Sequence, residues 1–192
     1  MATKDDIITL PNDHLRERSR KVKVITDDIK SLIADMEAAT LDWEASRPHE
    51  LGVALAAIQI DRLERVVVVR SDFDNKEDRS FITLINPEII KYEGTPELDH
   101  EGCLSVKDVY GIVPRYPKVR IRALDASGRD VRVKAEGFLA RILQHEIDHT
   151  NGVVFLDHVT DKEGFFKLDT DGKLTKLPYE EVVKMDILKE QT

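Results

Sequence analysis

The spacing of hydrophobic positions predicts one amphipathic helix in the first quarter of the chain. The pattern begins after Thr26, whose hydroxyl can cap a helix, and it ends before Pro48. The positions that recur at helical spacing are Ile29, Leu32, Ile33, Met36, Thr40 and Trp43. We therefore expect a helix that buries one face against the rest of the molecule.

Two short runs of β-branched and apolar residues predict buried strands. The first run covers Val66 to Val69 and lies between two arginines. The second covers Phe81 to Ile85, and we expect Asn86 and Pro87 to stop it. The polar stretch from Ser71 to Ser80 is predicted to connect the two strands.

Two further pairs of strands are predicted in the second half of the chain. Apolar and charged residues alternate over 118–123 and again over 131–134, across a turn at Asp125 to Gly128. A smaller hairpin is predicted from Phe165 to Leu168 and from Lys173 to Leu177, around an Asp-Gly turn.

Two more segments have helical spacing. The longer one runs from about Glu136 to Thr150, and Asn151 with Gly152 supplies a stop. Its apolar face consists of Phe138, Leu139, Ile142, Leu143 and Ile147. Pro178 can open a last amphipathic helix that carries Tyr179, Val182, Val183 and Ile187.

These elements predict an α+β fold in which antiparallel β-sheets pack around a central helix. N-terminal helices precede the sheets and a C-terminal tail follows them. At 192 residues, the chain fits one domain over 1–192, with 160–192 as a hairpin and helix extension.

Composition narrows the classes of function. Hydrophobic residues make up 41% and charged residues 34%, which is typical of a folded globular protein. The formal net charge of -8 disfavours direct binding to nucleic acid or anionic lipid. The N-terminus has acidic residues where a signal peptide needs positive charge, and no segment approaches membrane-spanning length. We expect a cytoplasmic protein without a membrane partner.

The strongest chemical signal is an H-E-x-x-H pattern inside the longer C-terminal helix. His145 and His149 are four residues apart, so both imidazoles lie on one helical face within reach of a single ion. An alternative is that they are ordinary polar residues. It is weakened because both histidines continue the stripe of Phe138 and Ile142, which points to the interior.

Glu146 lies about 100° around the helix from His145, near an ion without having to bind it. This is the place for a general base that activates water. The alternative is a solvated carboxylate. Asp148 is turned away from His145, and we expect it at the surface.

A third metal ligand is needed, and the residues alone leave several candidates. Cys103 is the only cysteine and cannot form an internal disulfide. Its thiol follows a glycine that permits close approach of the backbone, although a free buried cysteine is an equal alternative. His100, His158, Glu101 or Glu163 can equally complete a His/His/carboxylate set.

Three ordered motifs resemble those of the peptide deformylase family. They are Gly52 to Gln59 (GVALAAIQ), Glu101 to Ser105 (EGCLS) and Gln144 to His149 (QHEIDH). Tyr110 to Arg115 and Gly152 to Leu156 are similar as well, so the resemblance covers about Ile7 to Asp157.

The resemblance implies a role for each matching residue. Cys103, His145 and His149 would hold Fe²⁺, replaceable by Ni²⁺, Co²⁺ or Zn²⁺. Glu146 would be the acid and base. Gln59 and the backbone N–H of Leu104 would stabilise the oxyanion. The substrate's first residue would lie near Val53, Gly102 and Leu104, and Ala54 would lie beside the bound peptide.

The implied activity is removal of the N-formyl group from N-formylmethionyl peptides and nascent chains, near the ribosome. The chain departs from the family's pattern at Ala54, where glycine is usual, and at Lys107-Asp108, where Pro-Gly is frequent. Two other interpretations are a zincin-like metallopeptidase, which shares H-E-x-x-H, and a non-catalytic relative that binds formyl peptides.

Overall fold

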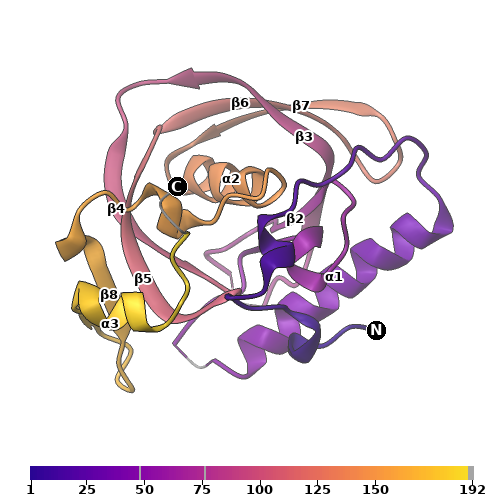
Figure 1. Ribbon diagram of the computed structural model, residues 1–192. Coiled ribbons are helices and arrows are strands. Elements are labelled where there is room, and N and C mark those ends of the chain that lie inside the picture. The colour runs from indigo at the N-terminus through magenta and orange to yellow at the C-terminus, as the bar shows by residue number, and fades with distance from the viewer. Residues whose placement is uncertain (48, 76, 190–192) are drawn as a thin grey trace.

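Two antiparallel sheets surround one helix in the computed structural model, which describes residues 1–47, 49–75 and 77–189 (Figure 1). The first sheet has the order β1-β2-β3-β6-β7, with β1 (Ala54–Ala56), β2 (Val66–Arg70), β3 (Phe81–Glu93), β6 (Lys118–Leu124) and β7 (Asp130–Glu136). The second has the order β4-β5-β8-β9, with β4 (Glu97–Cys103), β5 (Val106–Arg115), β8 (Phe165–Leu168) and β9 (Leu174–Lys176). The predicted α+β fold class is confirmed.

The helices are α1 (Asp27–Ala45), α2 (Gly137–His149) and α3 (Tyr179–Lys184), and single 3-10 turns include η3 (Ala57–Ile60) and η4 (Phe155–His158). Thr26 caps α1 through its side chain, as predicted. The helix ends three residues before Pro48, which itself lies outside the described residues.

Strand β2 lies between two hydrophobic cores because its side chains alternate between the two faces of the sheet. Val67 and Val69 belong to the core around α2, whereas Val66 and Val68 belong to the core beneath α1. All four valines are buried. The predicted strand is confirmed, and its two faces join the N-terminal helix to the central one.

Helix α2 lies in the space enclosed by the two sheets (Figure 1). Ala140, Leu143 and Ile147 pack against the first sheet, as the helical spacing predicts. The helix ends at His149, and the turn that follows it contains Gly152, which has a φ of 74°. A Cβ atom there would lie 2.3 Å from the carbonyl oxygen of Arg16, so only glycine fits where the N-terminal segment crosses the helix end.

Strand β3 is longer than predicted, because Asn86 and Pro87 do not end it. A register shift between Ile85 and Glu88 forms a bulge, at which the N–H that proline lacks is not needed. Asn86 has a φ of 54° and exchanges two side-chain hydrogen bonds of 2.8 Å with the backbone of Val22.

Two other predictions about elements need correction, and two strands were not predicted. Helix α3 ends at Lys184, so Ile187 lies beyond it, although its side chain is still buried. Phe138 is 56% exposed and contacts the ring of Phe73 instead of the core. Strands β4 and β5 were not predicted, and the first four residues of β4 are exposed. Both predicted hairpins are confirmed.

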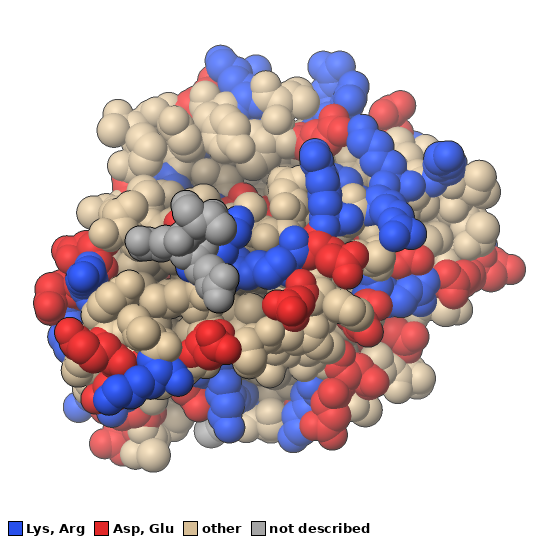
Figure 2. All heavy atoms as spheres, viewed as in Figure 1, with Lys and Arg blue, Asp and Glu red and all other residues tan. Residues whose placement is uncertain are grey.

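Surface charge is unevenly distributed despite the net negative charge of the chain. On the face shown in Figure 2, basic side chains gather toward the upper right, and acidic side chains are numerous below them. Within the described part of the chain, no helix has the length and apolar character needed to cross a membrane.

Candidate metal centre and active-site cavity

The structure brings together one sulfur and two imidazoles. The Sγ of Cys103 lies 3.2 Å from Nε2 of His149, which in turn lies 3.2 Å from Nε2 of His145. One donor atom from each residue lies within 4.8 Å of the other two. His145 and His149 are one turn apart on α2, and Cys103 ends β4, where a register shift breaks the pairing with β5.

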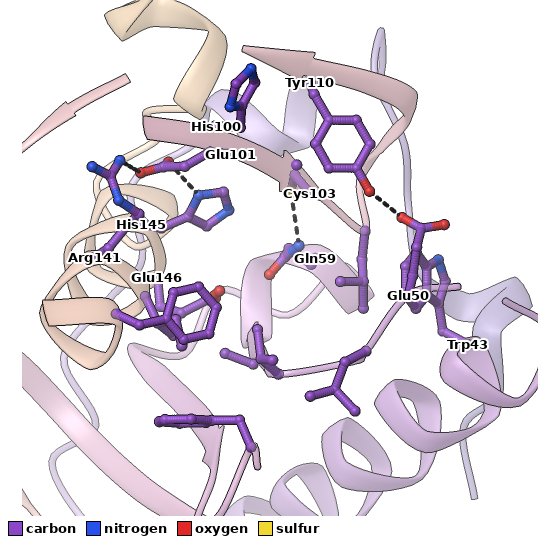
Figure 3. A pocket seen from close by; sticks show the side chains of 18 of the residues that line it. Trp43, Glu50, Gln59, His100, Glu101, Cys103, Tyr110, Arg141, His145 and Glu146 are labelled. Carbon is purple, nitrogen blue, oxygen red and sulfur yellow. Dashed lines mark hydrogen bonds and ion pairs between the residues drawn. The ribbon is translucent and has the colours of Figure 1, made fainter. Parts of the chain in front are cut away.

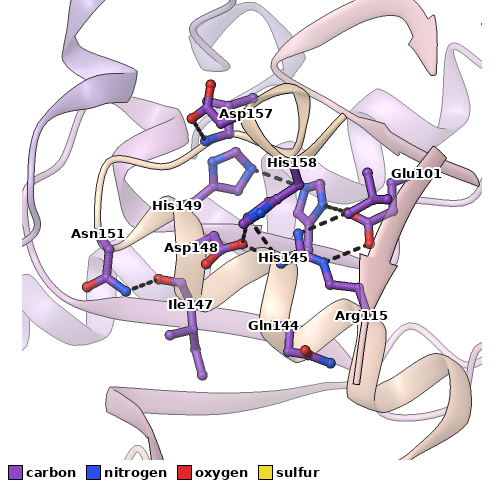
Figure 4. Close-up of polar contacts among 12 residues, drawn as sticks. Glu101, Arg115, Gln144, His145, Ile147, Asp148, His149, Asn151, Asp157 and His158 are labelled. Carbon is purple, nitrogen blue, oxygen red and sulfur yellow. Dashed lines mark hydrogen bonds and ion pairs between the residues drawn. The ribbon is translucent and has the colours of Figure 1, made fainter. Parts of the chain in front are cut away.

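Glu101 is the principal neighbour of this cluster. Its Oε2 lies 3.0 Å from Nδ1 of His145, which leaves Nε2 of that ring directed at the other donors (Figure 4). Arg115 and Arg141 also donate to the carboxylate, over distances of 2.9–3.1 Å. Burial raises the pKa of Glu101, but the hydrogen bond and charge of His145, followed by those of Arg115, outweigh it and lower this pKa far below its ordinary value. Glu101 therefore orients His145 and is not itself one of the clustered donors.

Asp148 is not the surface residue that the helix geometry predicts. It forms an ion pair with Arg115 and lies 2.8 Å from Nε2 of His158 (Figure 4). Its side chain is only 23% exposed. A series of ion pairs and hydrogen bonds therefore links the outer side of α2 to the cluster, because the arginine reaches around the helix. It runs through Asp148, Arg115, Glu101 and His145.

Glu146 is buried beside the cluster and has an unsatisfied atom. Its Oε2 has no hydrogen-bond partner among the described residues. Burial raises the pKa of Glu146 to about 7. A carboxyl group with such a pKa can accept and return a proton near neutral pH.

Gln59 presents its amide to the same place. Its Oε1 accepts a hydrogen bond of 2.8 Å from the backbone N–H of Ala56, which fixes the orientation of the amide group. Its Nε2 then donates to Ser105 Oγ at 3.1 Å and faces Cys103 Sγ at 3.5 Å (Figure 3). The side chain is buried in η3, directly after β1.

A cavity of about 370 Å³ opens over these groups. Of the nine residues predicted for the site, eight line it, namely Val53, Ala54, Gln59, Gly102, Cys103, Leu104, His145 and Glu146. His149 is fully buried behind them. Ala54 is therefore part of the cavity wall, although it is also buried in the core and pairs with Val69 inside the sheet.

The donor set fits a metal ion. Burial and the neighbouring His145 lower the pKa of His149 well below its ordinary value, so this ring is a neutral ligand. Burial opposes a charge on His145, but the Cys103 sulfur and the Glu101 carboxylate raise its pKa well above normal. The pocket thus favours one positive charge between the sulfur and the imidazoles, which a divalent cation would supply.

Sequence reasoning missed Arg115 and Arg141 and left Glu101 as one of several alternative ligands. Arg141 precedes His145 by one helical turn, so its spacing placed it on the same face. Nothing comparable indicated Arg115, which comes from the end of β5. Among the described residues, His100, His158 and Glu163 do not join the cluster of donors.

The chemistry available at this cavity is hydrolysis assisted by a metal ion, and this defines the class of protein. Within that class, the family model described as polypeptide deformylase matches residues 4–164. Because the match covers most of the sequence, the chain belongs to the polypeptide deformylase family.

Curated relatives agree with the family model. A peptide deformylase from Thermomicrobium roseum is 41% identical over 159 residues, covering 81% of this chain and 86% of the relative. One from Halothermothrix orenii is 44% identical over 145 residues, covering 76% and 86%. The match to this family favours a deformylase over a zincin-like peptidase.

Solved structures share the fold. The crystal structure of a peptide deformylase from Legionella pneumophila has a TM-score of 0.72 and 36% identity, covering 83% of this chain and 87% of that one. A peptide deformylase from Synechococcus elongatus, in complex with actinonin, has a TM-score of 0.72 and 33% identity, covering 81% and 79%.

Proposed function

We propose that the protein removes the N-formyl group from the N-terminal methionine of newly made polypeptides and releases formate. The chain belongs to the polypeptide deformylase family, and one observation of its structure carries the proposal. The buried Glu146 carboxylate has an oxygen without a partner in the described part of the chain, beside the Cys103, His145 and His149 donors that border the cavity. This is what a base that moves a proton during hydrolysis requires.

Cys103, His145 and His149 would hold the metal ion, which we propose to be Fe²⁺, with Ni²⁺, Co²⁺ or Zn²⁺ as substitutes. When bound, the ion supplies a Lewis acid for water and for the formyl oxygen. Zinc binds most nitrogen and sulfur sites more tightly than iron does, so cellular supply decides which ion is found.

Glu146 would take a proton from the attacking water as the water's oxygen bonds to the formyl carbon. The bond between this carbon and the peptide nitrogen then breaks, and Glu146 returns the proton to the departing amine. Gln59 Nε2 and the backbone N–H of Leu104 would donate to the oxygen on which negative charge develops. Losing one such donor typically costs about 10²- to 10³-fold in rate.

Substrate binding would involve Val53, Ala54 and Gly102, which all line the cavity. The formyl group carries only a hydrogen on its carbon, so it fits where an ordinary acyl group is excluded. Ala54 carries a methyl group where glycine is usual, and this methyl group would narrow the wall on which the peptide would lie. We expect it to alter affinity for the peptide more than the rate of the chemical step, because the reacting groups do not include it.

Newly made chains that begin with N-formylmethionine would be the partners of the enzyme, which we place in the cytoplasm close to the ribosome. Residues 1–192 would act as one domain. The extension over 160–192 forms β8, β9 and α3 as far as the structure describes it, to residue 189.

A formate-release assay tests the proposal. Protein loaded anaerobically with Fe²⁺, Ni²⁺ or Zn²⁺ is given N-formyl-Met-Ala-Ser and, separately, an unformylated peptide with internal bonds. We expect formate from the first and no cleavage of the second. Cleavage of internal bonds would favour a metallopeptidase. Binding of the formyl peptide without turnover, by all three forms, would favour a non-catalytic relative.

A further inference from the structure

Two chain segments form facing walls at one end of the cavity. One is the connection from α1 to β1, which contributes Glu50 and Val53. The other is the β4–β5 hairpin, which contributes Gly102 and Tyr110. In Figure 3, Tyr110 and Glu50 point toward one another on the side of the cavity away from His145.

A group of polar contacts joins these walls. The Tyr110 hydroxyl donates to Oε2 of Glu50 at 2.5 Å. Nη1 of Arg47 donates to Oε1 of the same Glu50 at 3.1 Å and to Oδ1 of Asp108 at 2.5 Å. The Arg47 guanidinium also lies over the ring of Trp43, 5.3 Å from its centroid. Two independent contacts therefore cross from the first wall to the second.

Tyr110 connects this group to the strand that bears Cys103. A Cβ atom on Gly102 would lie 2.5 Å from Cε1 of Tyr110, so the ring packs directly on the glycine backbone. Burial and the hydrogen bond to Glu50 raise the pKa of Tyr110 above its ordinary value, so the hydroxyl remains a donor. The position of Glu50 is thereby tied to the backbone next to Cys103.

Asp108, which pairs with Arg47 across the cavity, has an unusual backbone conformation. Its φ is 57°, in the left-handed region that favours glycine, although Asp and Asn tolerate it better than most residues. Glycine would relieve the backbone but could not pair with Arg47. The aspartate at this position, a departure noted in the sequence, therefore adds a charge that reaches the opposite wall.

We propose that Arg47, Glu50, Asp108 and Tyr110 form a clasp that fixes the spacing of the two cavity walls and so positions the peptide beyond its formylated first residue. The four are positioning residues and take no part in bond breaking. The inference rests on the proposed function, because it assigns the walls to a peptide substrate.

Three substitutions separate the parts of the clasp. Tyr110→Phe keeps the ring on Gly102 but removes the hydroxyl, and Asp108→Asn keeps a residue that tolerates positive φ but removes the charge. Asp108→Gly removes both the charge and the backbone strain. If the charge of Asp108 matters, Asp108→Gly and Asp108→Asn should weaken peptide binding to the same extent. If only the backbone conformation matters, the Asp108→Gly variant should bind peptide at least as well as the wild type.

Kinetic constants for N-formyl-Met-Ala-Ser and for the shorter N-formyl-Met amide provide the first readout. We expect KM for the longer substrate to rise about two- to fivefold in all three variants, the effect of losing a partly exposed polar pair. We expect kcat and metal content to remain near wild-type values, and the shorter substrate to be much less affected. Unchanged KM in every variant, or a fall in kcat alone, would overturn the clasp.

Arg62 offers a matched control, because its Nη2 also bridges two carboxylates, Asp28 and Glu64, each at 2.7 Å. Arg62→Met should leave KM unchanged, whereas Arg47→Met should raise it. An equal rise in both would show a general loss of stability instead of a role at the cavity, and would contradict the proposal.

Trp43, the only tryptophan, lines the cavity and provides a readout that needs no turnover. Titrating the unformylated product Met-Ala-Ser into zinc-loaded protein should change the fluorescence of Trp43. The clasp variants should bind this peptide more weakly than the wild type. If the wild type binds this peptide but releases no formate from N-formyl-Met-Ala-Ser, the proposed function fails while the clasp stands. No binding by the wild type, or equal binding by all variants, would overturn the clasp itself.

Discussion

The Nε2 atoms of His145 and His149 face one another at 3.2 Å inside the protein. Two nitrogen lone pairs cannot be held at this distance without a positive charge between them or a proton on one of the rings. Cys103 Sγ adds a third electron-rich atom at 3.2 Å from His149. Three electron-rich groups gathered in this way fit a bound cation, and we expect the properties of the protein to depend on one.

Removal of the metal should lower the stability of the fold. An ion present at 1,000 times its dissociation constant stabilises the native state by about 4 kcal/mol. For a chain of this size, this corresponds to a rise of roughly 10 °C in Tm. Thermal unfolding with excess Zn²⁺ and with a chelator measures the difference. Cys103→Ala should lose most of the rise, and an undiminished rise in this variant would place the ion elsewhere.

Glu146→Gln should separate chemistry from metal binding. The amide keeps the shape of the side chain but cannot accept the proton, so kcat should fall by about 10²- to 10⁴-fold. Because Glu146 is not among the clustered donors, the metal content should match that of the wild type. Elemental analysis beside formate release decides the matter, and turnover at the wild-type rate would refute the assigned role.

The rate should also depend on pH through the same carboxyl group. Burial raises the pKa of Glu146 to about 7, and a bound cation opposes this shift. The base acts when ionised, so kcat/KM should be high above the pKa and fall as the pH drops through it, with a midpoint at or below about 7. A profile of kcat/KM measured from about pH 8 to pH 5 tests the direction, and a rise toward acid would exclude Glu146 as the base.

Glu101→Gln should destabilise the protein even without metal. The carboxylate is the common partner of Arg115 and Arg141, and all three side chains are at least 90% buried. Removing its charge leaves the buried Arg141 guanidinium without its carboxylate partner and leaves Arg115 with Asp148 alone, which costs about 3–5 kcal/mol. Urea unfolding of the metal-free protein measures the loss. Glu93→Gln, which disturbs an exposed pair with Arg120, should cost far less than Glu101→Gln.

Local sequence patterns predicted the elements whose side chains meet a core. The valines of β2 and the apolar face of α2 follow the periods of a strand and a helix, and both elements form where expected. Strand β4 escaped prediction because four of its seven residues are exposed and only Leu98 of these four is apolar, so no alternation marks a buried face. The continuation of β3 past Pro87 depends on a bulge and on contacts of Asn86 with Val22, which lies 64 residues away.

The candidate site also contains residues that local sequence patterns predicted and residues that they did not. The four-residue spacing of His145 and His149 is a local signal that indicates an ion without further information. The resemblance was needed to choose Cys103, since its distance from α2 in the sequence carries no geometric information. The link from Asp148 through Arg115 to Glu101 joins three elements, so no local pattern could reveal it.

The cluster also bridges the two sheets, because Cys103 ends a strand of the second sheet while both imidazoles belong to a helix packed on the first. An ion held there would connect the two halves of the molecule through its protein ligands. Loading would then require that both halves have already docked, and a nascent copy of the enzyme would stay inactive until its own assembly is complete.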